Sequence, residues 1–274
     1  MPVQNLPGLI LDPAHPLARG LVAWYPLNEG AGRRANDISG NGNHGTHILD
    51  PSWTGTGGNL TGSALTLNGS SQYISVPTSG SLGIVGDMSM VCWLKISAYN
   101  WHMLFTKTNG GNAGPYSAYV NQVRGTIEFH RGNGTVTAYV ESTNPGAVNT
   151  WYCVAATMTG TTVQHYLNGA ANGSGTLSTT IADYGNALRL GNRPDGFWLG
   201  GQMANWRLYN RALSASEVAQ LVSEPYAGSL LPSTPRRYYT VAAASPPAAA
   251  TGPLSSDRLY NRSLSRIWRR GETG

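Results

Sequence analysis

Short runs that alternate apolar and polar residues, or that are rich in β-branched and aromatic residues, recur between residues 21 and 209 of the chain. Such runs favour β-strands, because successive side chains of a strand point to opposite faces of a sheet. The pattern predicts strands at residues 21–25, 64–67, 73–76, 88–96, 102–107, 116–121, 126–131, 135–141, 151–158, 162–167, 187–190 and 203–209.

The segments between these runs carry the residues that tight turns require. Examples are SGNGN at residues 39–43, NGGN at residues 109–112 and the Asn-Gly pair at residues 168–169. About a dozen short strands at this spacing predict an all-β fold, a two-sheet jelly-roll sandwich.

One helix is predicted after the last strand. Ser214 and Glu217 have capping-box spacing, in which the serine hydroxyl accepts from the third helical N–H and the glutamate reaches back. Val218 and Leu221 then share one face, and Pro225 ends the helix. We expect this short helix to cap the sandwich.

The composition supports a globular chain and a cytoplasmic origin. Of 274 residues, 41% are hydrophobic, enough for a sizeable core, and only 11% are charged, against about 25% in an average domain. No apolar run approaches the ~18 residues of a membrane span. Residues 1–5 carry no basic side chain and the apolar stretch at residues 8–11 is short, so we expect synthesis in the cytoplasm without a signal peptide. Cys92 and Cys153 are then expected to be buried thiols rather than a disulfide.

The charge divides the chain into a neutral body and a basic tail. Residues 1–227 hold eleven basic and eleven acidic side chains, whereas residues 228–274 hold seven arginines and two acids. The proline-rich residues 1–19 predict an extended N-terminal arm, and the Pro/Ala-rich residues 227–274 predict an extended C-terminal tail, on either side of a domain at residues 20–226.

The tail has the composition of a docking segment. Its arginines are interleaved with aromatic residues, and the expected partner-binding residues are Arg236, Arg237, Tyr238, Arg258, Arg262, Trp268, Arg269 and Arg270. This interleaving suits nucleic acid as well as an acidic protein surface. Because the excess of positive charge is only +5, we favour a protein partner over nucleic acid.

The tail also repeats the end of the domain. RLYNRALS at residues 207–214 recurs as RLYNRSLS at residues 258–265, with seven of eight positions identical. We expect the tail copy to make the same strand-to-turn contact on a neighbouring subunit, which predicts a homo-oligomer.

Several segments in order resemble the laminin-G-like jelly rolls of the concanavalin A-like lectin/glucanase superfamily. They are GLVAWYPLNEG at residues 20–30, DISGNGNHG at 37–45, WYCVA at 151–155 with YLNG at 166–169, LRLGNR at 188–193 and RLYNRALS at 207–214. The resemblance covers roughly residues 20–226 and leaves the arm and the tail outside.

The resemblance implies a sandwich with a binding edge, often with Ca²⁺. Members of the family usually carry an acid just after the position of Met203, where this chain has Ala204 and Asn205. One Ca²⁺ ligand is therefore missing, and no cofactor is expected. Asp37 and Asn41 are the candidate metal ligands if Ca²⁺ binds, although a structural turn is the favoured interpretation.

Catalytic patterns are missing from the sequence. Glucanase relatives use a Glu-x-Asp-x-Glu strand, which places the nucleophile and the acid on one face, and this chain has no such run. A Gly-x-Ser-x-Gly nucleophile elbow and a phosphate-binding loop are also lacking. We predict a protein that is not an enzyme.

Sugar binding favours aromatic platforms beside amide and carboxylate groups, because ring faces cover C–H patches and polar groups read hydroxyls. The candidate ligand-binding residues are Trp101, Tyr116, Asn192, Asp195 and Trp198.

Two functions are compatible with these features. The first is a non-catalytic structural protein at a virion surface, such as a phage capsid decoration or tail-associated protein, held to capsid or other virion proteins by its arm and tail and extracellular after release. The alternative is a lectin-like module that binds glycans at the loop edge.

Overall fold

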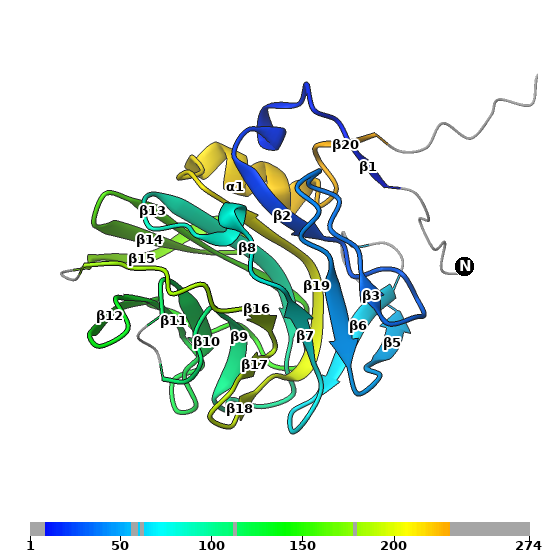
Figure 1. Ribbon diagram of the computed structural model, residues 1–274, viewed down its shortest axis with the longest axis horizontal. Coiled ribbons are helices and arrows are strands. Elements are labelled where there is room, and N and C mark those ends of the chain that lie inside the picture. The colour runs from blue at the N-terminus through cyan, green and yellow to red at the C-terminus, as the bar shows by residue number, and fades with distance from the viewer. Residues whose placement is uncertain (1–8, 56–59, 61–62, 112–113, 178–179, 231–274) are drawn as a thin grey trace, which may run out of the picture. The chain divides into compact units, whose positions relative to one another are not determined.

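The computed structural model describes residues 9–55, 60, 63–111, 114–177 and 180–230 and shows two antiparallel sheets packed face to face (Figure 1). The predicted all-β sandwich with one short helix is confirmed. The first sheet has the order β12 (Thr137–Glu141), β11 (Ile127–Gly132), β10 (Ser117–Val120), β9 (His102–Thr106), β16 (Leu188–Leu190), β7 (Tyr73–Val76), β4 (Gly45–Ile48) and β3 (Arg34–Ala35).

The second sheet also has eight strands. Its order is β15 (Ala170–Thr176), β14 (Thr162–Leu167), β13 (Tyr152–Thr159), β8 (Met88–Lys95), β19 (Gly200–Tyr209), β6 (Ser63–Asn68) and β5 (Ser52–Gly55), with β2 (Leu21–Tyr25) also paired to β19. Two small ribbons join β1 (Ile10–Leu11) to β20 (Ser229–Leu230) and β17 (Asn192–Arg193) to β18 (Phe197–Trp198). Each of the twelve predicted strands is present, and the described residues form eight further strands that were not predicted.

Alternation along the strands sends one set of side chains into the core between the sheets and the other set outward. In β8, Cys92 faces this core, whereas Cys153 of the neighbouring β13 lies in an apolar cluster on the outer face of the second sheet. The two thiols therefore point to opposite faces. Both cysteines are buried and free, as the sequence predicted.

A β-bulge changes this alternation in β19. Met203 and Trp206 both face the core although three positions separate them, because the pairing with β8 shifts between Ala204 and Arg207. Asn205 takes the extra position with φ +48°, a conformation that Asn tolerates better than most residues. Its Oδ1 accepts from Trp24 Nε1 at 2.7 Å.

Helix α1 (Ala215–Ser223) covers part of the outer face of the second sheet, where Val218 and Leu221 join the apolar cluster of Trp24, Val91 and Cys153. The predicted capping box is formed, with the Ser214 hydroxyl accepting from Glu217 N and the Glu217 carboxylate accepting from Ser214 N. The Glu217 carboxylate also pairs with Arg211, which lowers the pKa of that carboxyl to about 2.

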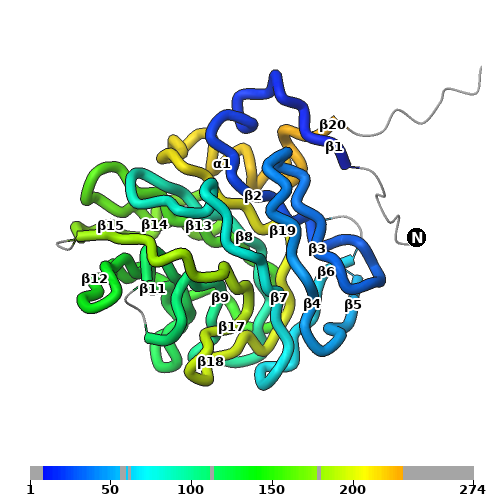
Figure 2. The backbone as a smooth tube through the Cα atoms, in the orientation of Figure 1, coloured from blue at the N-terminus to red at the C-terminus, as the bar shows by residue number. Residues whose placement is uncertain are grey.

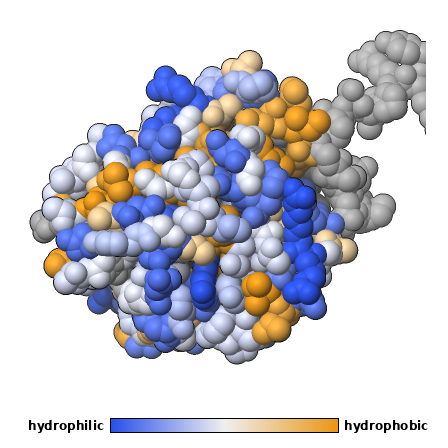
Figure 3. All heavy atoms as spheres, viewed as in Figure 1, coloured by the Kyte–Doolittle hydropathy of each residue, from blue (hydrophilic) through white to orange (hydrophobic). Residues whose placement is uncertain are grey.

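The described segments that flank residues 20–226 pair with each other. Ile10 and Leu11 of β1 lie opposite Leu230 and Ser229 of β20, and Leu17 of the 3-10 helix Pro16–Ala18 is buried in the outer apolar cluster. Apolar surface gathers around the β1–β20 ribbon (orange beside the grey segment, Figure 3), where Ile10 and Leu230 are 60% and 51% exposed. Within the described part of the chain, no helix has the length and apolar character needed to cross a bilayer.

Candidate functional site

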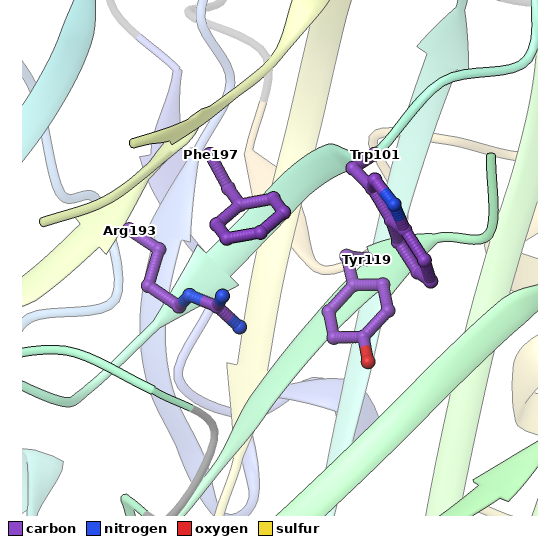
Figure 4. Close-up of a pocket in the computed structure, with 4 residues that line it drawn as sticks. All are labelled: Trp101, Tyr119, Arg193 and Phe197. Carbon is purple, nitrogen blue, oxygen red and sulfur yellow. The ribbon is translucent and has the colours of Figure 1, made fainter. Parts of the chain in front are cut away.

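A pocket of about 270 Å³ lies at the outer face of the first sheet and is lined by Trp101, Tyr119, Arg193 and Phe197. Figure 4 shows these four side chains pointing toward one another. Three are aromatic and one is cationic. They come from three places in the sequence, since Trp101 precedes β9, Tyr119 belongs to β10, and Arg193 and Phe197 lie on the β17–β18 hairpin.

Strand alternation and one tight turn bring these residues together. Ala118 and Val120 face the core, so Tyr119 between them projects from the opposite face of β10. The β17–β18 hairpin turns at Pro194-Asp195-Gly196, where Gly196 N donates to Arg193 O at 3.1 Å and Gly196 has φ +105°. The hairpin lies next to β9 (Figure 2), which places Phe197 beside Trp101.

The rings meet edge to face. The Trp101 ring is 5.1 Å from that of Tyr119 at an interplanar angle of 75°, and 6.4 Å from that of Phe197 at 86°. Edge-to-face packing suits the ring quadrupoles and fixes the positions of the three rings.

Arg193 is held in place from two sides. Its guanidinium carbon lies 3.9 Å from the centre of the Phe197 ring, and its Nε donates to Asp195 Oδ1 at 2.6 Å. The other oxygen of Asp195 accepts from Gly111 N at 3.0 Å. Burial raises the pKa of the Asp195 carboxyl, but these hydrogen bonds outweigh burial and hold that pKa below its usual value. The Asp195 carboxylate thereby balances the charge of Arg193 beside the pocket.

A buried polar network supports Tyr119 on its far side. The His130 ring is stacked between Tyr119 and Tyr139, at 4.7 and 4.8 Å. Glu128 accepts from His130 Nε2 at 3.1 Å and from Asn121 Nδ2 at 2.7 Å, and it is also hydrogen-bonded to Tyr119. Burial lowers the pKa of His130, so the imidazole is neutral at pH 7. This network positions Tyr119, and Glu128 is only 4% exposed.

The structure separates the five ligand-binding residues that the sequence suggested. Trp101 lines the pocket, and Asp195 orients Arg193 without lining it. Trp198 lines a different groove. Asn192 is buried and holds the hairpin, since its Nδ2 donates to Arg193 O and its Oδ1 accepts from Arg189. The prediction that Tyr116 binds a ligand was wrong. Its side chain is 0% exposed in the core and its hydroxyl donates to Leu82 O, so it cannot face a ligand.

Three pocket residues, Tyr119, Arg193 and Phe197, were not predicted. Tyr119 lies in a predicted strand, where the sequence favours a core role for an aromatic residue, whereas Phe197 lies outside the predicted strands and its neighbour Trp198 was chosen instead. The turn signal Pro-Asp-Gly between Arg193 and Phe197 was the available hint, because it places the two flanking residues side by side in a hairpin.

The candidate metal ligands belong to a structural turn. Asp37 Oδ1 accepts from Trp24 N and Ser39 N, and Oδ2 accepts from Asn43 N and the Ser39 hydroxyl, all at 2.9 Å. Asn41 Nδ2 donates to Leu21 O and Val22 O. Among the described residues, no group of three or more His, Cys, Asp or Glu side chains is arranged to hold a metal ion. The eight partner-binding residues of the tail lie outside the described residues.

The comparisons with known proteins agree with this fold. In sequence, no curated protein matches the chain. Domain 4 of AbnA, an extracellular arabinanase of Geobacillus stearothermophilus solved with arabinotriose, is 20% identical with a TM-score of 0.57, over 74% of this chain and 98% of that domain. The binding domain of Paraclostridial Mosquitocidal Protein 1 is 17% identical with a TM-score of 0.60, over 75% of this chain and 52% of that one.

A structure of botulinum neurotoxin type C, whose cell entry depends on two ganglioside molecules, is 10% identical with a TM-score of 0.58, over 74% of this chain and 50% of that one. The chain thus spans about half the length of these toxin structures. The family model of the concanavalin A-like lectin/glucanases superfamily matches residues 68–219, more than half of the chain. The chain belongs to the concanavalin A-like lectin/glucanases superfamily.

Proposed function

We propose that this protein is a non-catalytic carbohydrate-binding module whose ligand packs in the pocket of Trp101, Tyr119, Arg193 and Phe197. The convergence of three aromatic rings and one guanidinium on a single pocket carries the proposal. Aromatic faces cover the apolar C–H patches of a sugar, while a fixed donor reads its hydroxyls. The sugar ligands of the arabinanase domain and of the type C neurotoxin are consistent with this chemistry on the same fold.

The buried state of the nearby acids favours binding over hydrolysis. Glu128, which is hydrogen-bonded to Tyr119, is enclosed by three hydrogen-bonding partners and is 4% exposed. Asp195 is bonded to Arg193 and to the loop at Gly111. A glycosidase needs two carboxyl groups on either side of the scissile bond, one of them free to donate a proton.

Trp101→Ala is expected to weaken glycan binding at least about tenfold, since an aromatic anchor at the centre of a pocket typically contributes about 2 kcal/mol. A glycan array identifies the best ligand, and titration calorimetry with that ligand compares the variant with the wild type. Tyr184→Ala is the control, because this tyrosine is 61% exposed and does not line the pocket. Equal affinities for the Trp101 variant and the wild type contradict the proposed pocket.

We infer a second role, in assembly, from the basic tail. The seven arginines of residues 228–274 and the repeat at residues 258–265 suit docking to a neighbouring subunit or to another protein of a particle such as a virion. We expect the full chain to be a homo-oligomer and residues 1–233 to be a monomer by light scattering. Ending the shorter protein at residue 233 keeps the β1–β20 pairing intact. Identical masses per chain for both proteins contradict a role of the tail in self-assembly.

A further inference from the structure

A second groove lies on the other side of the Trp101 and Phe197 wall. It has a volume of about 440 Å³ and is lined by the end of β6, the loop between β8 and β9, and the β18–β19 corner. His102 and Trp198, which line it, directly follow Trp101 and Phe197, which line the aromatic pocket. Because successive residues of extended backbone point to opposite sides, each of these two pairs contributes one side chain to each cavity.

The groove combines an aromatic surface with neutral polar groups. Trp198 provides the indole, and its ring is fixed by an edge contact with Tyr73 at 5.9 Å. Ser97 provides a hydroxyl, and Asn100 provides an amide whose Oδ1 accepts from Trp101 N at 2.8 Å. The amide of Asn68 is bonded within its own turn, where Nδ2 donates to the Ser71 hydroxyl and Oδ1 accepts from Ser70 N. None of the described residues that line the groove is Asp, Glu, Lys or Arg.

His102 joins the two walls of the groove without adding charge. Gly200 N donates to His102 Nδ1 at 3.1 Å, so the ring proton lies on Nε2, which donates to Ala98 O at 3.0 Å. These bonds connect the loop between β8 and β9 to the start of β19. Burial lowers the pKa of His102, which keeps the imidazole neutral at pH 7.

We propose that this groove is a second, separate binding site for a neutral saccharide, so that each chain binds two ligand units. The inference rests on the proposed function, because the class of ligand is taken from the first pocket. A carboxylate or phosphate ligand is disfavoured, since no lining cation among the described residues compensates its charge. A hydroxyl-rich neutral ring matches both the indole face and the amide groups.

The test is titration calorimetry with the neutral glycan that gives the strongest array signal, used as its shortest binding fragment. The wild type is expected to bind two equivalents. Trp198→Ala is expected to lose one equivalent and keep the other, and Trp101→Ala to lose the opposite one. Ser97→Phe blocks the groove from an exposed position and is expected to match Trp198→Ala without removing a packed side chain.

Thr161→Phe is the matched control for added bulk. Thr161 is exposed and lies between β13 and β14, at the opposite end of the second sheet from residue 97, because Met158 pairs with Met88 at the start of β8. If the wild type binds only one equivalent of the glycan, the proposal of a separate second site is overturned. This holds whether the Trp198 and Ser97 variants bind as the wild type does or both bind more weakly. A glycan array without any signal contradicts the proposed function itself, so the two failures are distinguishable.

Discussion

Replacing Asp37 with alanine is expected to lower the free energy of unfolding by at least about 3 kcal/mol, because three buried backbone N–H groups lose their acceptor and each such loss costs about 1–3 kcal/mol. The groups are those of Trp24, Ser39 and Asn43. The effect is large for a single carboxylate because Asp37 is 5% exposed and little water reaches the site.

The geometry around β2 explains why this residue matters. Among the described strands, β2 pairs only with β19, along one of its edges. Along its other edge, the loop at residues 36–44 takes the place of a strand: Ile38 N donates to Trp24 O, and the side chains of Asn41 and Asn43 donate to Val22 O. Asp37 supplies the acceptor that a strand would provide through its carbonyl groups, so its removal exposes the edge of β2.

Urea unfolding of Asp37→Ala and of the wild type measures the loss. Asp50→Asn is the control, since Asp50 is a surface carboxylate that is 78% exposed and 3.7 Å from Arg33, and such pairs contribute about 0–1 kcal/mol. The same series in calcium chloride and in EDTA is expected to give equal midpoints for the wild type. A calcium-dependent gain that disappears in Asp37→Ala contradicts the structural role and identifies a metal ligand.

The Arg207→Ala substitution is expected to lower the free energy of unfolding by about 3–5 kcal/mol. It removes charged hydrogen bonds, a buried cation–π contact and the packing of a long side chain. The guanidinium carbon lies 3.6 Å from the Trp24 ring centre, and the side chain is 1% exposed. Its Nη1 and Nη2 donate to Ala227 O and Pro225 O at 2.9 and 2.6 Å. Arg207 therefore fixes the segment after α1 to the second sheet.

Two measurements separate packing from hydrogen bonding at this position. Arg207→Met keeps most of the side chain over Trp24 and loses the donors, so we expect a smaller loss of stability than for Arg207→Ala, but the same increase in proteolysis at residues 225–230. Arg33→Ala, at a position 69% exposed, is expected to change stability by less than about 0.5 kcal/mol. Unchanged proteolysis in both Arg207 variants contradicts the role assigned to the hydrogen bonds.

The strands that the sequence predicts are those that alternate or that form runs rich in apolar, β-branched and aromatic residues, such as β8 (MSMVCWLK) and β13 (YCVAATMT). The strands that it misses among the described residues are of three kinds. β1, β3, β17, β18 and β20 have two residues each, too few to show a period. β4 (GTHI) and β5 (SWTG) have four residues and few apolar side chains, and β15 (AANGSGT) is a polar edge strand with little apolar alternation. Pairing in the folded chain, rather than propensity, forms these segments: β1 pairs with β20 and β17 with β18, while β3 pairs with β4 and β15 with β14.

The candidate site was predicted only in part for a related reason. Trp101 was recognised because it stands in a loop, whereas Tyr119 stands in a predicted strand and looks like a core residue. Phe197 lies outside the predicted strands, and the sequence singled out its neighbour Trp198 instead. Tyr116 and Tyr119 are three positions apart in one segment, yet Tyr116 is in the core and Tyr119 lines the pocket. The different positions of these two side chains depend on the register of β10 against β9 and β11, and no local property of the sequence reports that register.

The sequence by itself determined the all-β class, the twelve main strands, the capping box of α1 and the free cysteines, because each of these follows from local periodicity, local hydrogen bonding or composition. Only the tertiary structure decided that Asp37 completes the edge of β2, that Asn205 forms a bulge and that Arg193 meets Trp101, Tyr119 and Phe197. These features join residues up to 181 positions apart, as in the bond from Trp24 to Asn205. Contacts of that range depend on how whole sheets pack and pair, which local patterns along the chain do not encode.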